Sequence, residues 1–274
     1  MKKIIIIAFA FLAVTGCNRL KYPKNTVLIS TKYGDMVVKL YDETPKHRDN
    51  FLKLAKEKYY DGTLFHRIIN QFMIQGGDPD SRKATQGQLL GDGGPGYDIP
   101  AEFNPALIHK KGAIAAAREG DEVNPQKASS GSQFYIVQGK VFTDPELTQL
   151  EQKINQRNKM KILDKLLQNP ENAARRARLT EYRAKNDSID YMNEINEMIP
   201  TVDAEFAKTK SFKFTDQQRK IYTTIGGAPF LDGSYTVFGE VIKGMDVLDK
   251  IAAVSTDKNN RPVEDIKMTV KVLR

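Results

Sequence analysis

Residues 65–78 read FHRIINQFMIQGGD, an apolar run that ends in two glycines and an aspartate. The β-branched and aromatic side chains favour a single extended strand over residues 65–74. Alternate side chains of a strand point to the same face, so Arg67, Ile69 and Gln71 would share one face unless a bulge resets the alternation. An arginine in such a run is unusual, because arginine is seldom buried without a partner. Arg67 is therefore either paired with a carboxylate at a strand end or a cation with a function.

The surrounding pattern predicts a β-rich domain. Apolar and polar residues alternate through residues 27–40 around a turn at residues 33–35, which predicts a hairpin. Thr44 followed by Pro45 predicts a helix start with Thr44 as its cap, since proline is favoured at the first helical position. The same patterns predict short strands at residues 111–117, 133–137 and 267–273, and a helix at residues 246–253.

A helical insertion interrupts this domain. Residues 141–224 contain no glycine, and apolar residues recur there at helical spacing. One such pattern runs through residues 179–199, and Pro200 either ends it or starts another helix. We therefore predict a β domain formed by residues 25–140 and 225–274, with residues 141–224 as the insertion.

The insertion begins with a clear helix signal, but its purpose stays open. Residues 143–146 read TDPE, which combines a threonine cap, an early proline and a glutamate three residues after the cap. The insertion could be a structural pair of helices packed on the barrel, a homo-oligomer interface, or a grip on unfolded client proteins. None of these alternatives supplies catalytic residues.

The first residues look like a targeting signal. Lys2 and Lys3 precede an apolar run at residues 4–14 that is too short to span a bilayer, and Thr15-Gly16-Cys17 follow. This resembles a bacterial lipoprotein signal, so we expect a signal at residues 1–17, lipidation of Cys17 and a tether at residues 18–25. The resemblance implies a lipid-anchored protein of the bacterial cell envelope that faces the periplasm. Cys17 is the only cysteine, so an intrachain disulfide is excluded.

Several ordered motifs resemble one family. Residues 65–78 are similar to the signature of the cyclophilin family of peptidyl-prolyl isomerases, which is FHR, two aliphatic and two variable residues, FM, one variable residue and QGGD. Further matches are GGPGY at residues 93–97, GAIAAAR at 112–118, GSQFYI at 131–136, and FLDG with VFG between 230 and 239. The insertion and the signal lie outside these motifs.

The resemblance implies a mainly β fold, namely a closed antiparallel eight-stranded barrel capped by two helices and carrying the α-helical insertion. It also implies a peptidyl-prolyl cis-trans isomerase that assists the folding of extracytoplasmic proteins, acts on proline-containing polypeptides and needs no cofactor. The alternative is a client-binding chaperone that uses the insertion, with isomerase activity secondary.

The resemblance also implies a set of site residues. Arg67 is expected to stabilise the twisted prolyl amide, and Gln75 to orient Arg67 by a hydrogen bond. The substrate-binding residues are expected to be Phe72, Met73, Tyr135 and Leu231 around the proline ring, Gln133 and the backbone of Ala117 and Arg118 along the flanking chain, and Phe230 and Tyr235 at the rim. Tyr135 stands where many members have phenylalanine, so its hydroxyl needs a partner.

Other classes of function find little support. The formal charge of +8 is interleaved with acidic residues, whereas a nucleic-acid binder concentrates it in one block. The glycines at 91–96 lack a Gly-Lys-Ser/Thr ending and contain Pro95, so they do not form a phosphate loop. The three histidines are scattered without zinc-site spacing. Ser132 lacks a nucleophile-elbow context, so a hydrolase is not supported.

Overall fold

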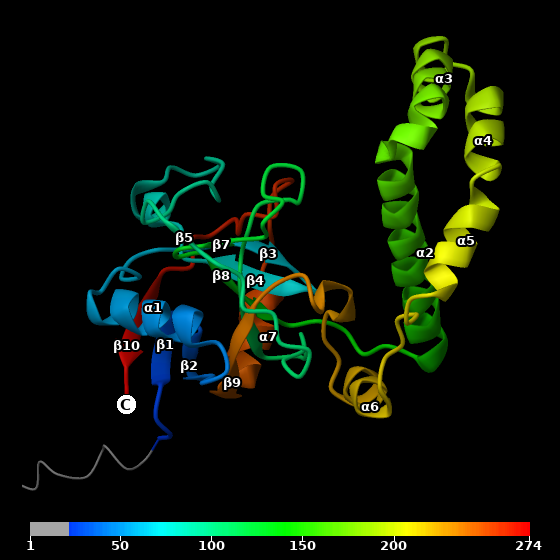
Figure 1. Cartoon of the computed structure of the whole chain (residues 1–274). Coiled ribbons are helices and arrows are strands. Elements are labelled where there is room, and N and C mark those ends of the chain that lie inside the picture. Colours follow the sequence, from blue (N-terminus) through cyan, green and yellow to red (C-terminus); the bar gives the residue numbers. More distant parts are fainter. Residues whose placement is uncertain (1–21) are drawn as a thin grey trace, which may run out of the picture. The chain divides into compact units, whose positions relative to one another are not determined.

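The computed structural model describes residues 22–274, and it divides into two compact units (Figure 1). The first unit comprises the described residues up to Lys140 together with Gly227–Arg274, and the second is Val141–Gly226. The expected signal, with Cys17, lies outside the described residues. Within the described part of the chain, no helix combines the length and the apolar character needed to cross a membrane.

The first unit is built on an eight-stranded antiparallel sheet with the order β10-β1-β2-β9-β6-β8-β4-β3. Its strands are β1 Thr26–Thr31, β2 Gly34–Leu40, β3 Phe65–Ile69, β4 Met73–Gly76, β6 Ala113–Ala116, β8 Phe134–Val137, β9 Val237–Lys243 and β10 Met268–Val272. A bridge between Leu64 and Lys267 joins the two edges of this sheet. The predicted eight-stranded antiparallel barrel is thereby confirmed. A separate pair of short strands is β5 Asp98–Ile99 and β7 Ser129–Ser130.

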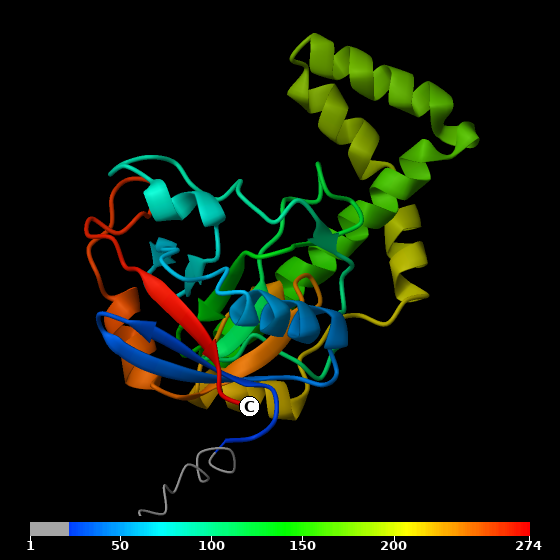
Figure 2. The ribbon, with the colours of Figure 1, turned by 90° about the vertical axis from the view of Figure 1, so that its left-hand side faces the viewer.

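Two helices pack on the barrel, α1 Pro45–Lys56 and α7 Met245–Ala252. Phe51 of α1 and Leu248 of α7 are buried in the same apolar core as Ile114 and Ile136 of the central strands. Figure 2 shows β10 beside the hairpin β1–β2, although they come from opposite ends of the described chain. Because this closure joins distant segments, the core is completed only when the C-terminal strand pairs.

The cap of α1 differs from the expected one. The helix begins at Pro45 as predicted, but the Thr44 side chain makes no capping hydrogen bond. Instead, the Glu102 carboxylate accepts hydrogen bonds from the backbone N–H groups of Lys46 (3.1 Å) and His47 (3.0 Å). A carboxylate at this position also complements the positive end of the helix dipole. A residue more than fifty positions away thus replaces the local threonine cap.

The motif at residues 65–78 forms a hairpin, so the prediction of one continuous strand was wrong. Strand β3 pairs with β4, and Arg67 lies opposite Gln75. The turn is closed by the Phe72 N–H, which donates to the Ile69 carbonyl at 3.0 Å, and Gln71 adopts a positive φ of 61°. Gln71 therefore does not share a strand face with Arg67. No glycine or proline marks this turn, which is why the apolar pattern concealed it.

The second unit is helical and has its own apolar cluster. Its helices are α2 Asp144–Gln168, α3 Ala173–Ala184, α4 Ser188–Asn196, α5 Ile199–Ala207 and α6 Asp216–Thr224. The cluster is formed by Leu163, Leu179, Ile195, Met198 and Val202. The pattern at residues 179–199 covers parts of α3 and α4 and the first residue of α5 rather than one helix, because the chain turns between α3 and α4 with Asn186 at a positive φ of 56°. Pro200 stands in the first turn of α5.

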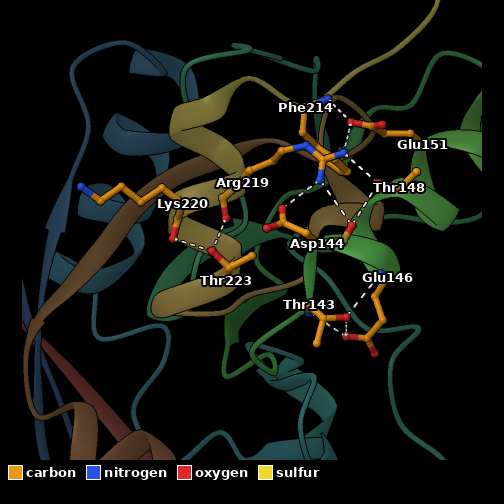
Figure 3. A network of polar contacts seen from close by, with 9 residues as sticks. All are labelled: Thr143, Asp144, Glu146, Thr148, Glu151, Phe214, Arg219, Lys220 and Thr223. Atoms are coloured by element: carbon orange, nitrogen blue, oxygen red, sulfur yellow. Dashed lines mark hydrogen bonds and ion pairs between the residues drawn. The ribbon is translucent and has the colours of Figure 1, made fainter.

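Polar contacts define the start of α2 and join it to α6 (Figure 3). Thr143 and Glu146 form the capping box that residues 143–146 predicted. Arg219 of α6 contacts Asp144 at 3.0 Å and Glu151 at 2.9 Å, both on α2. Glu151 is almost completely buried, so its carboxylate needs this cationic partner. The network therefore holds together the two helices at the ends of the insertion.

Candidate active site

A pocket of about 340 Å³ on the first unit brings together nine of the expected site residues. These are Arg67, Phe72, Met73, Gln75, Ala117, Arg118, Tyr135, Leu231 and Tyr235. Gln133 instead lines a neighbouring pocket of about 740 Å³, which also contacts Gln75, Ala117 and Arg118. Phe230 lies beside the first pocket, 43% exposed, with its ring 5.3 Å from that of Phe72. Residues from four separate stretches of sequence thus meet at one place.

The apolar part of the pocket comes from strands β4 and β8. Met73 on β4 is only 1% exposed, and Tyr135 on β8 is also buried. The pairing of Gln75 with Tyr135 places the two strands side by side. Phe134 faces the opposite way into the barrel core, as its alternation with Tyr135 predicted. The outward-facing residues therefore leave a small apolar concavity on a rigid sheet.

Arg67 is held at this pocket by a chain of amides. Its Nη1 donates to Gln75 Oε1 at 3.1 Å, which the cross-strand pairing of the two residues explains. Gln75 Nε2 donates to Gln133 Oε1 at 3.3 Å. Gln133 Nε2 in turn donates to the carbonyls of Gly91 (2.6 Å) and Gly93 (2.8 Å). The hydrogen bonds thus link the arginine to the glycine-rich loop.

The charge of Arg67 is not neutralised by a neighbour. The side chain is half-buried, and no carboxylate of residues 22–274 forms an ion pair with it. Burial lowers the pKa of the Arg67 guanidinium, while nearby Tyr235 acts in the opposite direction. The alternative of an arginine paired with a carboxylate is therefore not what the structure contains. A guanidinium remains charged despite such a shift, because its pKa lies far above neutral pH.

The Tyr135 hydroxyl has the partner that its sequence position required. It lies 3.0 Å from Nε2 of His109, whose Nδ1 lies 2.9 Å from a carboxylate oxygen of Asp232. Burial raises the pKa of Tyr135 well above its usual value, so the phenol stays protonated. Sequence reasoning missed His109, because nothing local connects it to Tyr135. The only available signal was the replacement of phenylalanine by tyrosine.

The backbone near Arg118 differs in part from the expectation. The N–H and carbonyl of Ala117 already bond to Gln133 and Ser130 within the protein, at 3.0 and 2.9 Å. Among the described residues, the backbone groups of Arg118 have no such partner. The Arg118 side chain packs over the Tyr235 ring at 4.5 Å and donates to the Ser234 carbonyl at 2.9 Å. The side chain of Arg118 therefore holds Tyr235 in place, and the expected backbone contact with a flanking chain could come from Arg118 but not from the Ala117 groups.

The loop before the glycines also contributes, which the sequence did not indicate. Leu90, Gly91 and Asp92 line the pocket beside Arg67. The loop is anchored by the buried Arg261, whose Nη1 donates to the backbone carbonyls of Thr85 and Gln88. In the described part of the chain, no group of three or more potential metal ligands is present.

Comparison with known proteins identifies the protein family that this chain resembles. The family model for cyclophilin type peptidyl-prolyl cis-trans isomerase matches residues 26–174 and 203–272. The match therefore reaches into both ends of the insertion, further than the sequence motifs did. A cyclophilin-type isomerase from Cryptosporidium parvum, solved in the presence of the dipeptide Ala-Pro, shares the fold with a TM-score of 0.50 and 20% identity, over 90% of this chain and 98% of that one.

Curated bacterial relatives agree with the fold. A putative peptidyl-prolyl cis-trans isomerase from Staphylococcus haemolyticus is 30% identical, over 88% of this chain and 86% of its own length. A putative bifunctional phosphatase/peptidyl-prolyl cis-trans isomerase from Streptococcus pyogenes is 31% identical, and the chain spans only 37% of that longer protein. Family match, relatives and fold agree with the motifs: the chain belongs to the cyclophilin-type peptidyl-prolyl cis-trans isomerases.

Proposed function

We propose that the chain isomerises peptide bonds before proline in proteins that fold outside the cytoplasm, with Arg67 stabilising the twisted amide. One observation carries this assignment. Arg67 is a half-buried cation at the edge of an apolar pocket, and its only hydrogen bond to a described residue is to Gln75. Since a guanidinium has five N–H donors, most of them are available to a substrate.

The reaction requires electrostatics rather than covalent chemistry. Amide resonance sets a rotation barrier of about 18–20 kcal/mol, so uncatalysed prolyl isomerisation takes on the order of 10–100 s. When the bond twists, resonance is lost and the proline nitrogen gains a localised lone pair. An N–H of Arg67 directed at that nitrogen favours the twisted state over both planar states. No bond is made or broken, so neither nucleophile nor cofactor is required.

The pocket supplies the complementary half of the mechanism. Met73, Tyr135 and Leu231 present an apolar surface suited to a pyrrolidine ring. A ring held there immobilises the residue after the bond. The preceding residue is then free to rotate, while Arg67 holds the prolyl carbonyl or nitrogen. Gln75 keeps the guanidinium in position through its 3.1 Å hydrogen bond.

The test compares Arg67→Ala with the wild-type protein and with Arg157→Ala, a control at an exposed position of α2. The isomerisation rate of an Ala-Pro peptide is measured by NMR exchange spectroscopy at saturating peptide. Removal of one electrostatic donor typically lowers such a rate by about 10²–10³-fold, and we expect this for Arg67→Ala only. Equal rates in all three folded proteins would refute the role of Arg67.

The extracytoplasmic location rests on the signal-like pattern that ends at Cys17. In a bacterial host, the full chain is expected to sediment with membranes and to be released by Cys17→Ser. If Cys17→Ser remains with the membranes, the lipid anchor is removed from the proposal. The catalytic assignment stays intact in that case as long as Arg67→Ala still loses isomerisation.

A second candidate function is suggested by the surface of α4. Ile189 is 73% exposed and Met192 is 51% exposed, and their spacing of three places them on one helix face. Exposed apolar side chains, methionine in particular, suit adaptable contacts with unfolded chains. The double variant Ile189→Ser with Met192→Ser should then suppress client aggregation less well than the wild type, with unchanged peptide isomerisation. Unchanged suppression of aggregation by the double variant would contradict the chaperone role. Sedimentation of the wild type as an oligomer, and of the double variant as a monomer, would instead assign this surface to a homo-oligomer interface.

A further inference from the structure

A buried chain of three polar side chains lies behind the pocket. The Tyr135 hydroxyl, the His109 ring and the Asp232 carboxylate follow one another at 3.0 and 2.9 Å. The His109 side chain is fully buried, and that of Asp232 is 10% exposed. His109 does not line the pocket itself. The mechanism proposed above uses Tyr135 only as an apolar surface and leaves the other two residues without a role.

The geometry determines the direction of each hydrogen bond. The backbone N–H and Nδ1 of His109 both lie 2.9 Å from the same oxygen of Asp232, and a carboxylate oxygen can only accept. In the neutral imidazole, Nδ1 therefore carries the proton and Nε2 carries the lone pair. The Tyr135 hydroxyl must then donate to Nε2. A phenylalanine at this position would leave the buried Nε2 without a donor, which is unfavourable.

The chain joins two parts of the pocket that are distant in sequence. Tyr135 belongs to strand β8, whereas Asp232 directly follows the short 3₁₀ helix Pro229–Leu231. The His109 carbonyl also accepts from the N–H of Ala228 at 2.8 Å. His109 therefore contacts residues 228 and 232, which lie on both sides of Leu231 in the pocket wall. Through its ring it also holds the aromatic ring of Tyr135.

We propose that His109 and Asp232 are positioning residues for prolyl isomerisation, and that they act through Tyr135 by fixing its ring against the wall that carries Leu231. This inference rests on the proposed function, because it presumes that the proline ring occupies this pocket. The ring occupies it in the planar and the twisted state alike. Loss of positioning therefore weakens peptide binding more than it lowers the rate at saturation.

The central experiment measures peptide affinity and saturated rate separately. His109→Leu removes both ring hydrogen bonds, and we expect the Kd for an Ala-Pro peptide in an NMR titration to rise about three- to tenfold, with a smaller change in the saturated rate. His109→Gln has an oxygen that can accept from Tyr135 and an amide that can donate to Asp232, so it should restore most of the affinity. The double variant His109→Leu with Tyr135→Phe should bind as weakly as His109→Leu alone, because both changes interrupt one chain.

Three results would overturn the inference. They are an unchanged Kd in folded His109→Leu, no recovery in His109→Gln, and additive losses in the double variant. If His109→Leu does not fold, the ¹⁵N NMR signals of the His109 ring in the unmodified protein decide instead. A proton on Nδ1 and a lone pair on Nε2 support the chain, whereas the opposite tautomer contradicts it. Because Kd needs no catalysis, these results are independent of whether Arg67→Ala loses activity.

Discussion

Replacement of Gln75 by leucine tests how Arg67 is held. The change keeps the approximate size of the side chain but removes Oε1, which accepts from Arg67 Nη1 at 3.1 Å, and Nε2, which donates to Gln133 Oε1 at 3.3 Å. Gln133 keeps its hydrogen bonds to the carbonyls of Gly91 and Gly93, so the loop beside the pocket remains anchored. The perturbation therefore affects mainly the order of the guanidinium.

The expected effect on the rate follows from the contact with Arg67. A hydrogen bond that involves a charged group contributes about 1.5–3 kcal/mol, and the half-exposed position of Arg67 favours the lower value. If that stabilisation is lost only in the twisted state, kcat falls about tenfold, since about 1.4 kcal/mol corresponds to one power of ten. KM should change little, because Met73, Tyr135 and Leu231 are untouched.

Gln75→Glu separates the holding of Arg67 from its charge. The carboxylate would accept the same hydrogen bond from Arg67, so the guanidinium stays ordered, although the donor to Gln133 Oε1 is lost as in Gln75→Leu. A negative charge about 4 Å away interacts with the cation by about 4 kcal/mol at an effective dielectric constant of 20, which reduces its effect on the proline nitrogen. We therefore expect kcat to fall at least as far in Gln75→Glu as in Gln75→Leu.

Both variants are assayed by NMR exchange spectroscopy on an Ala-Pro peptide, with Kd from titration and the fold checked by amide spectra. Wild-type kcat in folded Gln75→Leu would show that Gln75 does not position Arg67. A kcat in folded Gln75→Glu above that of Gln75→Leu would contradict the requirement for an uncompensated cation.

Three further predictions concern stability. Burial lowers the pKa of His66 from 6.5 to about 4, so between these two pH values the unfolded chain binds more protons than the folded protein. The free energy of unfolding of the barrel should therefore fall by about 2 kcal/mol between pH 7 and pH 5. Urea unfolding of the wild type and His66→Gln at both pH values measures this change, and a pH-independent difference between the two proteins would contradict it. Glu102→Ala removes the carboxylate that caps α1 and should destabilise the barrel by about 1–2 kcal/mol, with a smaller loss in Glu102→Gln; equal losses would argue against capping. Glu151→Ala breaks the contact with Arg219, so amide exchange should accelerate in α2 and α6 while the barrel strands keep their protection; unchanged exchange in both helices would make the contact unimportant.

The fold class and most residues of the pocket could be predicted because their signals are local. The motif at residues 65–78 contains Arg67, Phe72, Met73 and Gln75 within nine positions, and the resemblance to the family signature marks each of them. The helix starts at Pro45 and after Thr143 are also local, since an early proline acts on neighbouring backbone groups in both helices and the Thr143 cap does so in α2. The alternation around Phe134 correctly assigned it to the core.

Other features depend on contacts between distant segments. The turn at Gln71 has no glycine or proline, so only its pairing shows that residues 65–76 form a hairpin. The cap of α1 comes from Glu102, and no periodicity relates that residue to the helix. The role of Arg261 in anchoring the loop beside the pocket is likewise invisible in the chain order.

From its sequence alone, this protein is recognisable as a barrel with Arg67 beside an apolar pocket, because its ordered motifs resemble those of the cyclophilin family and the resemblance implies both. Only the tertiary structure decided that Arg67 lacks a carboxylate partner among the described residues, and that Tyr135 reaches Asp232 through His109. The physical reason is that burial and hydrogen bonding are set by which segments meet in space. A polar side chain acquires its role from partners that the local sequence does not specify.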